Sequence, residues 1–150
     1  MRFQHGFTVV EITVVLAVAT LIMAIAGPPL VRIHKRAQLR QAVDSMAASH
    51  SLARATAIQA GAIAELHIDP AGAQHWVQVD TGAAAVGTTV GGIVRFRRGD
   101  LSSNRTLLCF DPRGMPTSTG ACDPPDATIV FRLVDLRDTL TITGLGRIIR

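Results

Sequence analysis

Apolar side chains form one long block near the start of the chain. From Phe7 to Val31 the only charged residue is Glu11, and the apolar run that begins at Ile12 continues past Gly27-Pro28-Pro29. A helix that spans a bilayer needs about 20 predominantly apolar residues, and a charge within it costs at least ~2.5 kcal/mol on insertion scales. The pattern therefore predicts a membrane-spanning helix in which the Glu11 carboxylate requires a partner.

A different pattern follows the apolar block, from Arg32 to Ala60. Apolar positions recur there at the spacing of one helix face. Pro28 and Pro29 predict a bend or a short break before this segment, and Gly61 is placed to end it. The sequence thus predicts a long helix whose second half is amphipathic and packs on a sheet. The predicted stripe consists of Leu39, Val43, Met46, His50 and Ala53.

After Gly61 the pattern changes to short alternating runs, which are typical of β-strands. The turn residues Asp69-Pro70-Ala71-Gly72 separate the first two runs and predict a hairpin. The segment 81–92 is rich in glycine and small residues and predicts a flexible loop. The predicted strands are 62–69, 74–80, 93–97, 107–110, 128–134 and 139–143, with a terminal piece at 147–150.

Length and composition limit the remaining architecture. The chain has 150 residues, 48% of them hydrophobic, and about 120 residues remain beyond the apolar block. That is enough for one compact domain with its own core. The expected fold class is α+β, with a long N-terminal helix packed on a β-sheet head. The formal charge of +4 permits a polyanionic partner without requiring one.

Three interpretations compete for the N-terminal block. A secretory signal peptide would have a small-residue cleavage site at Ala24-Ile25-Ala26, but Glu11 lies inside its apolar core and Pro28 lies just beyond the cut. A plain membrane anchor leaves Glu11 unexplained. In the third interpretation Gly6 ends a short leader, Phe7 begins the mature chain, and Glu11 is its fifth residue. These residues resemble the N-terminal signature of type IV pilins.

The resemblance implies a processing and assembly pathway. Prepilin peptidase would cut between Gly6 and Phe7 and methylate the new amino group. Residues 1–6 would be the leader, 7–31 the transmembrane and filament-core helix, and 32–150 a periplasmic head attached to the bacterial inner membrane. In a filament with other pilins or pseudopilins, Glu11 would neutralise the amino terminus of a neighbouring subunit.

The order of one helix followed only by strands resembles a subgroup of this family. Within the superfamily it is similar to the minor pseudopilin H and FimT group, whose head motifs resemble residues 110–114 and 141–148. The resemblance implies a structural subunit of a periplasmic pseudopilus for type II secretion or of a type IV pilus. Membership also implies no enzymatic activity and no cofactor.

Two cysteines, Cys109 and Cys122, are present. If the head is exported to an oxidising periplasm, as the resemblance implies, the even count suggests one disulfide. Two free thiols or half of a metal site remain the alternative.

The sequence shows no catalytic or metal-binding motif among those sought, including a nucleophile elbow and a zinc-binding helix. His67 and His75 would face each other across the predicted hairpin near Asp69, either as ordinary strand surface or as metal ligands. Trp76 is expected to pack in the core or between sheet and helix, rather than to contact a ligand. Asp123 is expected in a solvated turn.

The chain ends in Gly146-Arg147-Ile148-Ile149-Arg150. In FimT-like minor pilins a C-terminal glycine-arginine motif is implicated in DNA uptake, and Arg147 matches its arginine. Arg150 lies one position later than the motif would place a second arginine. The resemblance therefore leaves two interpretations open, a DNA-contacting tip at Arg147 and Arg150 or the end of a structural hairpin.

Overall fold

The computed structural model describes residues 8–79 and 87–150, without the side chains of 26–29. Gly6 and Phe7 therefore lie outside the described residues, as does most of the predicted loop before Thr88. The chain divides into two compact units, Met1–Arg36 and Ala37–Arg150.

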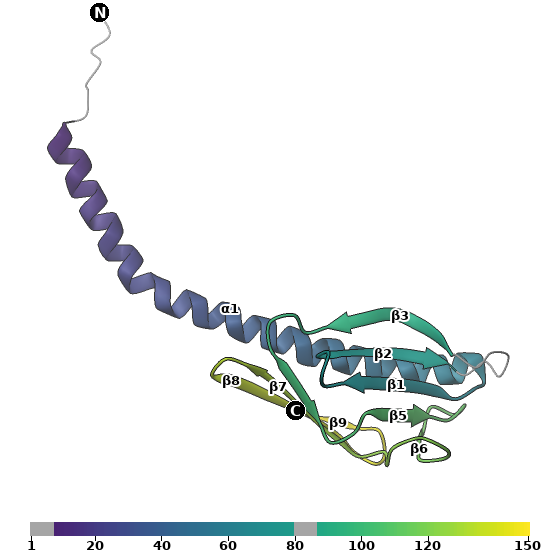
Figure 1. The fold of residues 1–150 in the computed structure, drawn as a ribbon. Helices are drawn as coiled ribbons and strands as arrows, with labels where there is room; N and C mark the ends of the chain where they lie inside the picture. The colour runs from purple at the N-terminus through teal and green to yellow at the C-terminus, as the bar shows by residue number, and fades with distance from the viewer. Residues whose placement is uncertain (1–7, 80–86) are drawn as a thin grey trace, which may run out of the picture. The chain divides into compact units, whose positions relative to one another are not determined.

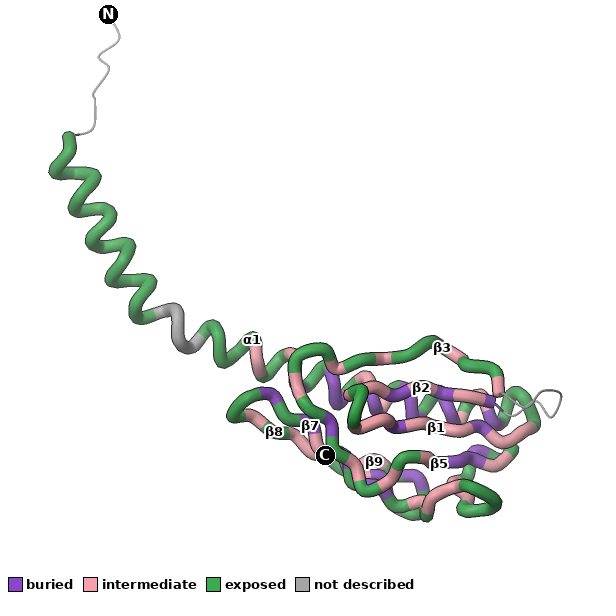
Figure 2. The backbone as a smooth tube through the Cα atoms, in the orientation of Figure 1, coloured by how far each residue is buried: buried purple, intermediate pink, exposed green. Residues whose placement is uncertain are grey.

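One helix, α1, runs from Val9 to Ala60 and enters both units. In the first unit every described side chain up to Ile25 is exposed, as the green stretch of α1 in Figure 2 shows. Over the described residues, no single helix meets the length and composition expected of a membrane span. The segments Val9–Ile25 and Leu30–Ala60, taken together as a bent pair, do have the length and composition that a membrane span requires. The helix α1 continues through Pro28 and Pro29 and does not end there.

The second unit contains two antiparallel sheets that follow α1 in the chain (Figure 1). The five-stranded sheet has the order β3-β2-β1-β5-β6 and the four-stranded sheet the order β4-β7-β8-β9. The α+β class and the helix-on-sheet arrangement are confirmed. The first sheet contains β1 (Ala64–Asp69), β2 (Gln74–Val79), β3 (Thr88–Arg95), β5 (Leu107–Phe110) and β6 (Pro116–Thr117), and the second contains β4 (Asp100–Ser103), β7 (Ala127–Leu133), β8 (Leu136–Ile142) and β9 (Ile148–Ile149).

The core lies between the second half of α1 and the inner faces of both sheets. Met46, Leu66 and Phe131 are among its completely buried side chains, and the purple segments of Figure 2 trace it through helix and strands. Burial of the predicted helical stripe is confirmed at all of its positions, with at most 5% exposure from Leu39 to Ala53. Each large apolar side chain buried this way contributes about 2 kcal/mol.

Three strand predictions were wrong. Residues 88–92 belong to β3 instead of a loop. Gly91 and Gly92 have positive φ angles there, and the pairing of β3 with β2 is irregular at this point, so the strand lacks the usual alternation pattern. The short strands β4 and β6 were missed. The strand β8 begins three residues before the predicted start, because a two-residue turn at Val134-Asp135 joins β7 directly to it. Val134 has a φ of 56°, a conformation that β-branched residues rarely adopt, so the sequence pattern did not indicate a tight turn.

Candidate functional site

The start of α1 is built around Thr8 and Glu11. The Thr8 hydroxyl accepts a hydrogen bond from the backbone N–H of Glu11 at 3.2 Å, and the Thr8 carbonyl accepts one from Ile12. This is the Thr-x-x-Glu spacing of a helix capping box, and a carboxylate in the first turn is favoured by the helix dipole. The sequence analysis considered only a cationic partner for the Glu11 carboxylate and missed its local role at the start of the helix. The capping-box spacing is nevertheless visible in Thr8-Val9-Val10-Glu11.

The helix from Val9 to Ile25 is apolar on every side. Val9 and Ile25 are more than 70% exposed, whereas the hydroxyls of Thr13 and Thr20 donate to backbone carbonyls of the same helix. A helix that is hydrophobic all round is typically buried in a membrane or in protein. Within the described chain, no hydrogen bond or ion pair is formed by the Glu11 carboxylate. Glu11 is thus the single charged group that this segment offers to a neighbour.

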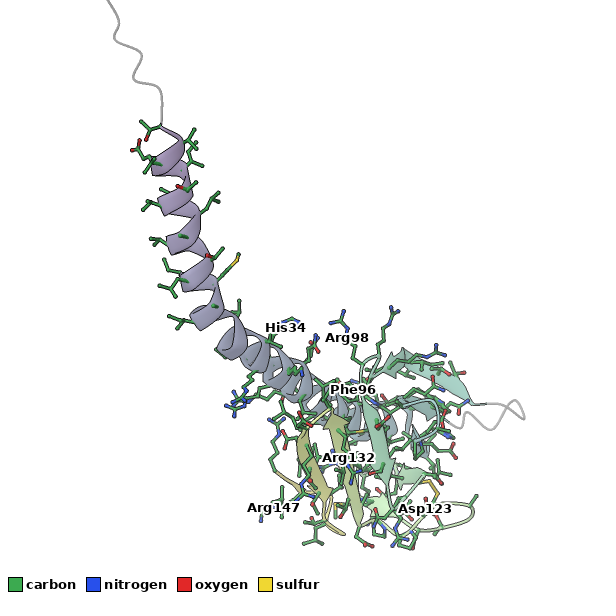
Figure 3. All side chains as sticks on the ribbon, turned by 60° about the vertical axis from the view of Figure 1, so that its left-hand side comes forward. His34, Phe96, Arg98, Asp123, Arg132 and Arg147 are labelled. Carbon is green, nitrogen blue, oxygen red and sulfur yellow. A yellow bond between two sulfur atoms is a disulfide. The ribbon has the colours of Figure 1, made fainter. Side chains whose placement is uncertain are left out.

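A disulfide links Cys109 in β5 to Cys122, with the two Cα atoms 5.7 Å apart. The predicted pairing is confirmed. The adjacent Asp123 carboxylate accepts hydrogen bonds from the backbone N–H groups of Thr106 at 2.8 Å and Leu107 at 2.9 Å. The Leu107 and Thr106 N–H groups lower the pKa of Asp123. Asp123, labelled in Figure 3, therefore holds the start of β5 in place and is not simply a solvated turn residue.

The turn after β5 docks on the second half of α1. Asp111 accepts hydrogen bonds from the backbone N–H groups of Arg113 and Met115 through its carboxylate, and the Gly114 carbonyl accepts one from Arg54 Nε at 2.9 Å. Gly114 has a φ of 73°, and a Cβ at this position would lie 2.8 Å from Ile58 Cδ1. The motif at 110–114 is thus explained by a tight turn pressed against the helix.

Gly114→Ala is expected to destabilise the head more than Gly120→Ala. Both glycines have similar positive φ angles, but a Cβ at Gly120 would meet no atom within 4 Å. Each change therefore costs about 1 kcal/mol of backbone strain, and Gly114→Ala adds a smaller cost, because the exposed end of the Ile58 side chain must move aside. Thermal unfolding of the two variants in parallel measures the difference. Equal melting temperatures would show that the contact with Ile58 is unimportant.

The C-terminal residues form a tight turn and the last strand of the second sheet. Gly146 N–H donates to the Thr143 carbonyl at 2.7 Å, and Arg147 N–H donates to the Thr143 hydroxyl at 3.1 Å. Gly146 has a φ of 73°, which explains a glycine at this place in the turn. The motif at 141–148 is therefore accounted for by hairpin geometry.

The structure does not bring Arg147 and Arg150 together. Arg150 forms an ion pair with Asp44 of α1 at 2.5 Å, although both side chains are more than half exposed. Arg147 lies at the periphery of the head in Figure 3, and its side chain forms no ion pair or hydrogen bond with any described residue. Positions 147 and 150 also fall on opposite faces of an extended segment. The two arginines thus do not form one basic tip.

The histidines of the β1–β2 hairpin do not face each other. His67 is paired with Trp76, whereas His75 is paired with Ile68, so the two imidazoles lie on opposite faces of the sheet. The predicted juxtaposition was wrong by one residue of register. Trp76 was expected in the core, but it lies half-buried on the outer face, where its ring stacks on His67 with centroids 4.9 Å apart. In the described part of the chain, no three His, Cys, Asp or Glu side chains are grouped to hold a metal.

His50 lies in the core without a hydrogen-bond partner for Nε2 among the described residues. It is 2% exposed and meets the edge of Phe110, with ring centroids 5.1 Å apart. Burial, with a smaller contribution from the Arg54 charge, lowers the pKa of His50 to about 4. His50 is therefore neutral at physiological pH and acts as a core side chain.

Solved structures with the same fold include two crystal forms of the type IV minor pilin FimU from Pseudomonas aeruginosa. One aligns with a TM-score of 0.56 and 19% sequence identity, over 78% of this chain and 90% of FimU. The other aligns with a TM-score of 0.56 and 15% identity, over 74% of this chain and 90% of FimU. No protein-family model and no curated protein sequence matches the chain. The chain therefore has the type IV pilin fold.

Proposed function

We propose that this chain is a minor pilin or minor pseudopilin, a structural subunit of a type IV pilus or of a type II secretion pseudopilus. Prepilin peptidase would remove residues 1–6 and methylate Phe7. Residues 7–31 would reside in the inner membrane and later in the filament core, and residues 32–150 would form the periplasmic head. The subunit would work through protein contacts and membrane lipid, without catalysis or a cofactor.

One observation carries this proposal: an all-round apolar helix bears a single carboxylate and is attached to a head with the pilin fold. An exposed apolar surface of this extent requires lipid or protein around it. In that surrounding the Glu11 carboxylate needs a cationic partner, because an isolated charge in a low dielectric is strongly disfavoured. The methylated amino terminus of a neighbouring subunit would supply that charge. The fold of FimU, which is described as a type IV minor pilin, is consistent with this role.

Glu11→Ala is expected to leave processing intact and to impair assembly. N-terminal mass spectrometry of the variant from its native host should find the same methylated Phe7 as in the wild type. Recovery of the subunit in sheared or detergent-resistant filaments should fall at least about tenfold, because the charge pair is lost. Thr20→Ala, which removes a hydroxyl that bonds within the helix, is the matched control and should assemble normally.

A mature chain that begins elsewhere than Phe7 would reject the processing scheme. Normal recovery of Glu11→Ala in filaments would reject the charge pairing while leaving processing unaffected. Gly6→Ala should block cleavage and give an uncut chain in membranes. The genes beside this one would distinguish a secretion machine from a pilus machine.

A second candidate function, DNA binding, is favoured by the exposed and unpaired side chain of Arg147 in the described structure. Arg147→Gln should weaken binding of duplex DNA by the full chain and lower the logarithmic salt slope by about 0.9. Arg137→Gln, which removes an exposed arginine of β8, is the charge-matched control. An equal effect of the two changes, or no binding at low salt, would assign Arg147 to the hairpin alone.

A further inference from the structure

A cavity of about 260 Å³ opens beside the connection between β3 and β4. One wall is the second half of α1 and includes Gln41 and Ala42, and much of the remaining lining is apolar, including Phe96 and Leu101. The volume is near the lower end of protein ligand sites, which begin at about 300 Å³. It suits one medium-sized side chain together with its backbone groups.

A buried histidine, His75, is one of the residues that line this cavity. His75 is 3% exposed, and its Nε2 has no hydrogen-bond partner among the described residues. The ring also forms a hydrogen bond to the backbone of Ser45 that raises its pKa, so the ring donates and the Ser45 carbonyl accepts. Burial has the larger effect and lowers the pKa of His75, which keeps the ring neutral. The second nitrogen, Nε2, is then an acceptor that requires an N–H or O–H donor.

The mouth of the cavity is cationic. Arg95, Arg97 and Arg98 contribute to its lining and are exposed. Arg95 donates to Gln74 at 2.8 Å, whereas the side chains of Arg97 and Arg98 form no hydrogen bond or ion pair with described residues. Figure 3 shows Arg98 extending outward near the more deeply placed Phe96. Two guanidinium groups thus remain available for an anion.

We propose that this cavity binds the carboxy-terminal residue of a partner polypeptide that ends in a medium-sized apolar side chain. The apolar side chain would fill the cavity, the last amide N–H would donate to His75 Nε2, and the terminal carboxylate would pair with Arg97 and Arg98. A single carboxy-terminal residue thus supplies a group for each of the three features of the site. Capture of a chain terminus goes beyond the filament role and does not depend on it.

A nucleic acid fits the same features less well. Single-stranded DNA needs an accessible aromatic face on which a base can stack. The Phe96 ring is half-buried and packs edge to face on Phe131, with centroids 5.8 Å apart. In the cavity wall, Phe96 therefore provides apolar contact and no free face for stacking. A polypeptide terminus matches the site better than a nucleic acid does.

The test uses N-acetyl-L-leucine as a mimic of such a terminus. The full chain, in nanodiscs of uncharged phosphatidylcholine, is titrated while the His75 ring is observed by nitrogen-15 NMR. N-acetyl-L-leucine should shift the His75 Nε2 resonance in a saturable way. N-acetyl-L-leucinamide, which lacks the carboxylate, should bind at least about tenfold more weakly, the loss expected for a charge-assisted contact. Equal affinity of the two compounds would overturn the proposal.

A pair of double variants locates the binding site. Arg97→Gln with Arg98→Gln should weaken N-acetyl-L-leucine binding about tenfold, whereas Arg132→Gln with Arg137→Gln removes the same charge from exposed positions outside the cavity and should change it less than about twofold. Ala42→Leu, which fills the cavity, should also abolish the shift. Undiminished binding after the double change of Arg97 and Arg98, or a shift that persists in Ala42→Leu, would overturn the proposal. So would a decathymidylate that shifts His75 where N-acetyl-L-leucine does not, because it would assign the site to DNA.

Discussion

Acidification from pH 7 to pH 4 is expected to remove about 3 kcal/mol from the folding free energy of the head, mainly because His50 must stay neutral in the core. The folded-state pKa of His50 is lowered from 6.5 to about 4 by burial and by the charge of Arg54. Below pH 6.5 the unfolded chain binds a proton that the folded chain does not. The stability is therefore complete above pH 6.5, falls as the pH decreases toward 4, and levels off below that value.

His75 and Asp123 also make the stability of the head depend on pH, His75 in the same direction as His50 and Asp123 at lower pH. The pKa of His75 is also lowered by burial, so His75 adds to the loss between neutral and mildly acidic pH. The lowered pKa of Asp123 matters below about pH 5, where the unfolded chain begins to bind a proton that the folded carboxylate resists through its hydrogen bonds to Leu107 and Thr106. The loss above about pH 5 can therefore be assigned to the histidines.

Urea unfolding of the detergent-solubilised chain, followed by the fluorescence of Trp76, measures this dependence. His50→Leu should reduce the loss between pH 7 and pH 4 by most of its size, because no group at that position would then bind a proton. His67→Leu changes a partly exposed histidine on the outer face and is the matched control. An equal loss in the wild type and in His50→Leu would contradict the assignment to His50.

Reduction of the Cys109–Cys122 disulfide is expected to cost about 3 kcal/mol, the value that chain entropy gives for a loop near 15 residues. For a head of this size the melting temperature should fall on the order of 10 °C. The loop contains the turn at Gly114, which receives the hydrogen bond from Arg54. Without the disulfide, the contacts between this turn and α1 must by themselves offset the entropy that is lost when the turn becomes ordered.

Thermal unfolding with and without a phosphine reductant tests this expectation in the unmodified chain. The double variant Cys109→Ala with Cys122→Ser is the companion, since Cys109 is 1% exposed and tolerates an apolar replacement better than a hydroxyl. Its melting temperature should match that of the reduced wild type and should not respond to the reductant. A wild type that melts at the same temperature in both conditions would contradict the expected stabilisation.

The extent and the buried face of α1 could be predicted from the sequence because the signals for them are local. The stripe from Leu39 to Ala53 follows the helix period, and each of its side chains is buried in the structure. Gly61 follows the last helical residue, Ala60, and has a φ of 61°, as expected of a helix end. These features depend on a few neighbouring residues and on one repeated period.

The strand registers and the site contacts were harder to predict because they depend on distant partners. One residue of register separates His67 from His75, and the turn geometry that sets it is not visible in the alternation pattern. Val134 closes a tight turn in a conformation unusual for its residue type. The pairing of Arg150 with Asp44 joins residues that are far apart in the sequence, so the C-terminal motif alone could not indicate it.

The bulged strand β3 has a consequence for heads that are crowded side by side. It forms one edge of the five-stranded sheet, and its two positive-φ glycines interrupt the regular ladder. A long flat edge exposes a row of unpaired backbone groups on which a neighbouring chain could add a strand. The irregular backbone of β3 makes such addition unfavourable, so that heads at high local concentration would keep their sheets separate and would not aggregate through this edge.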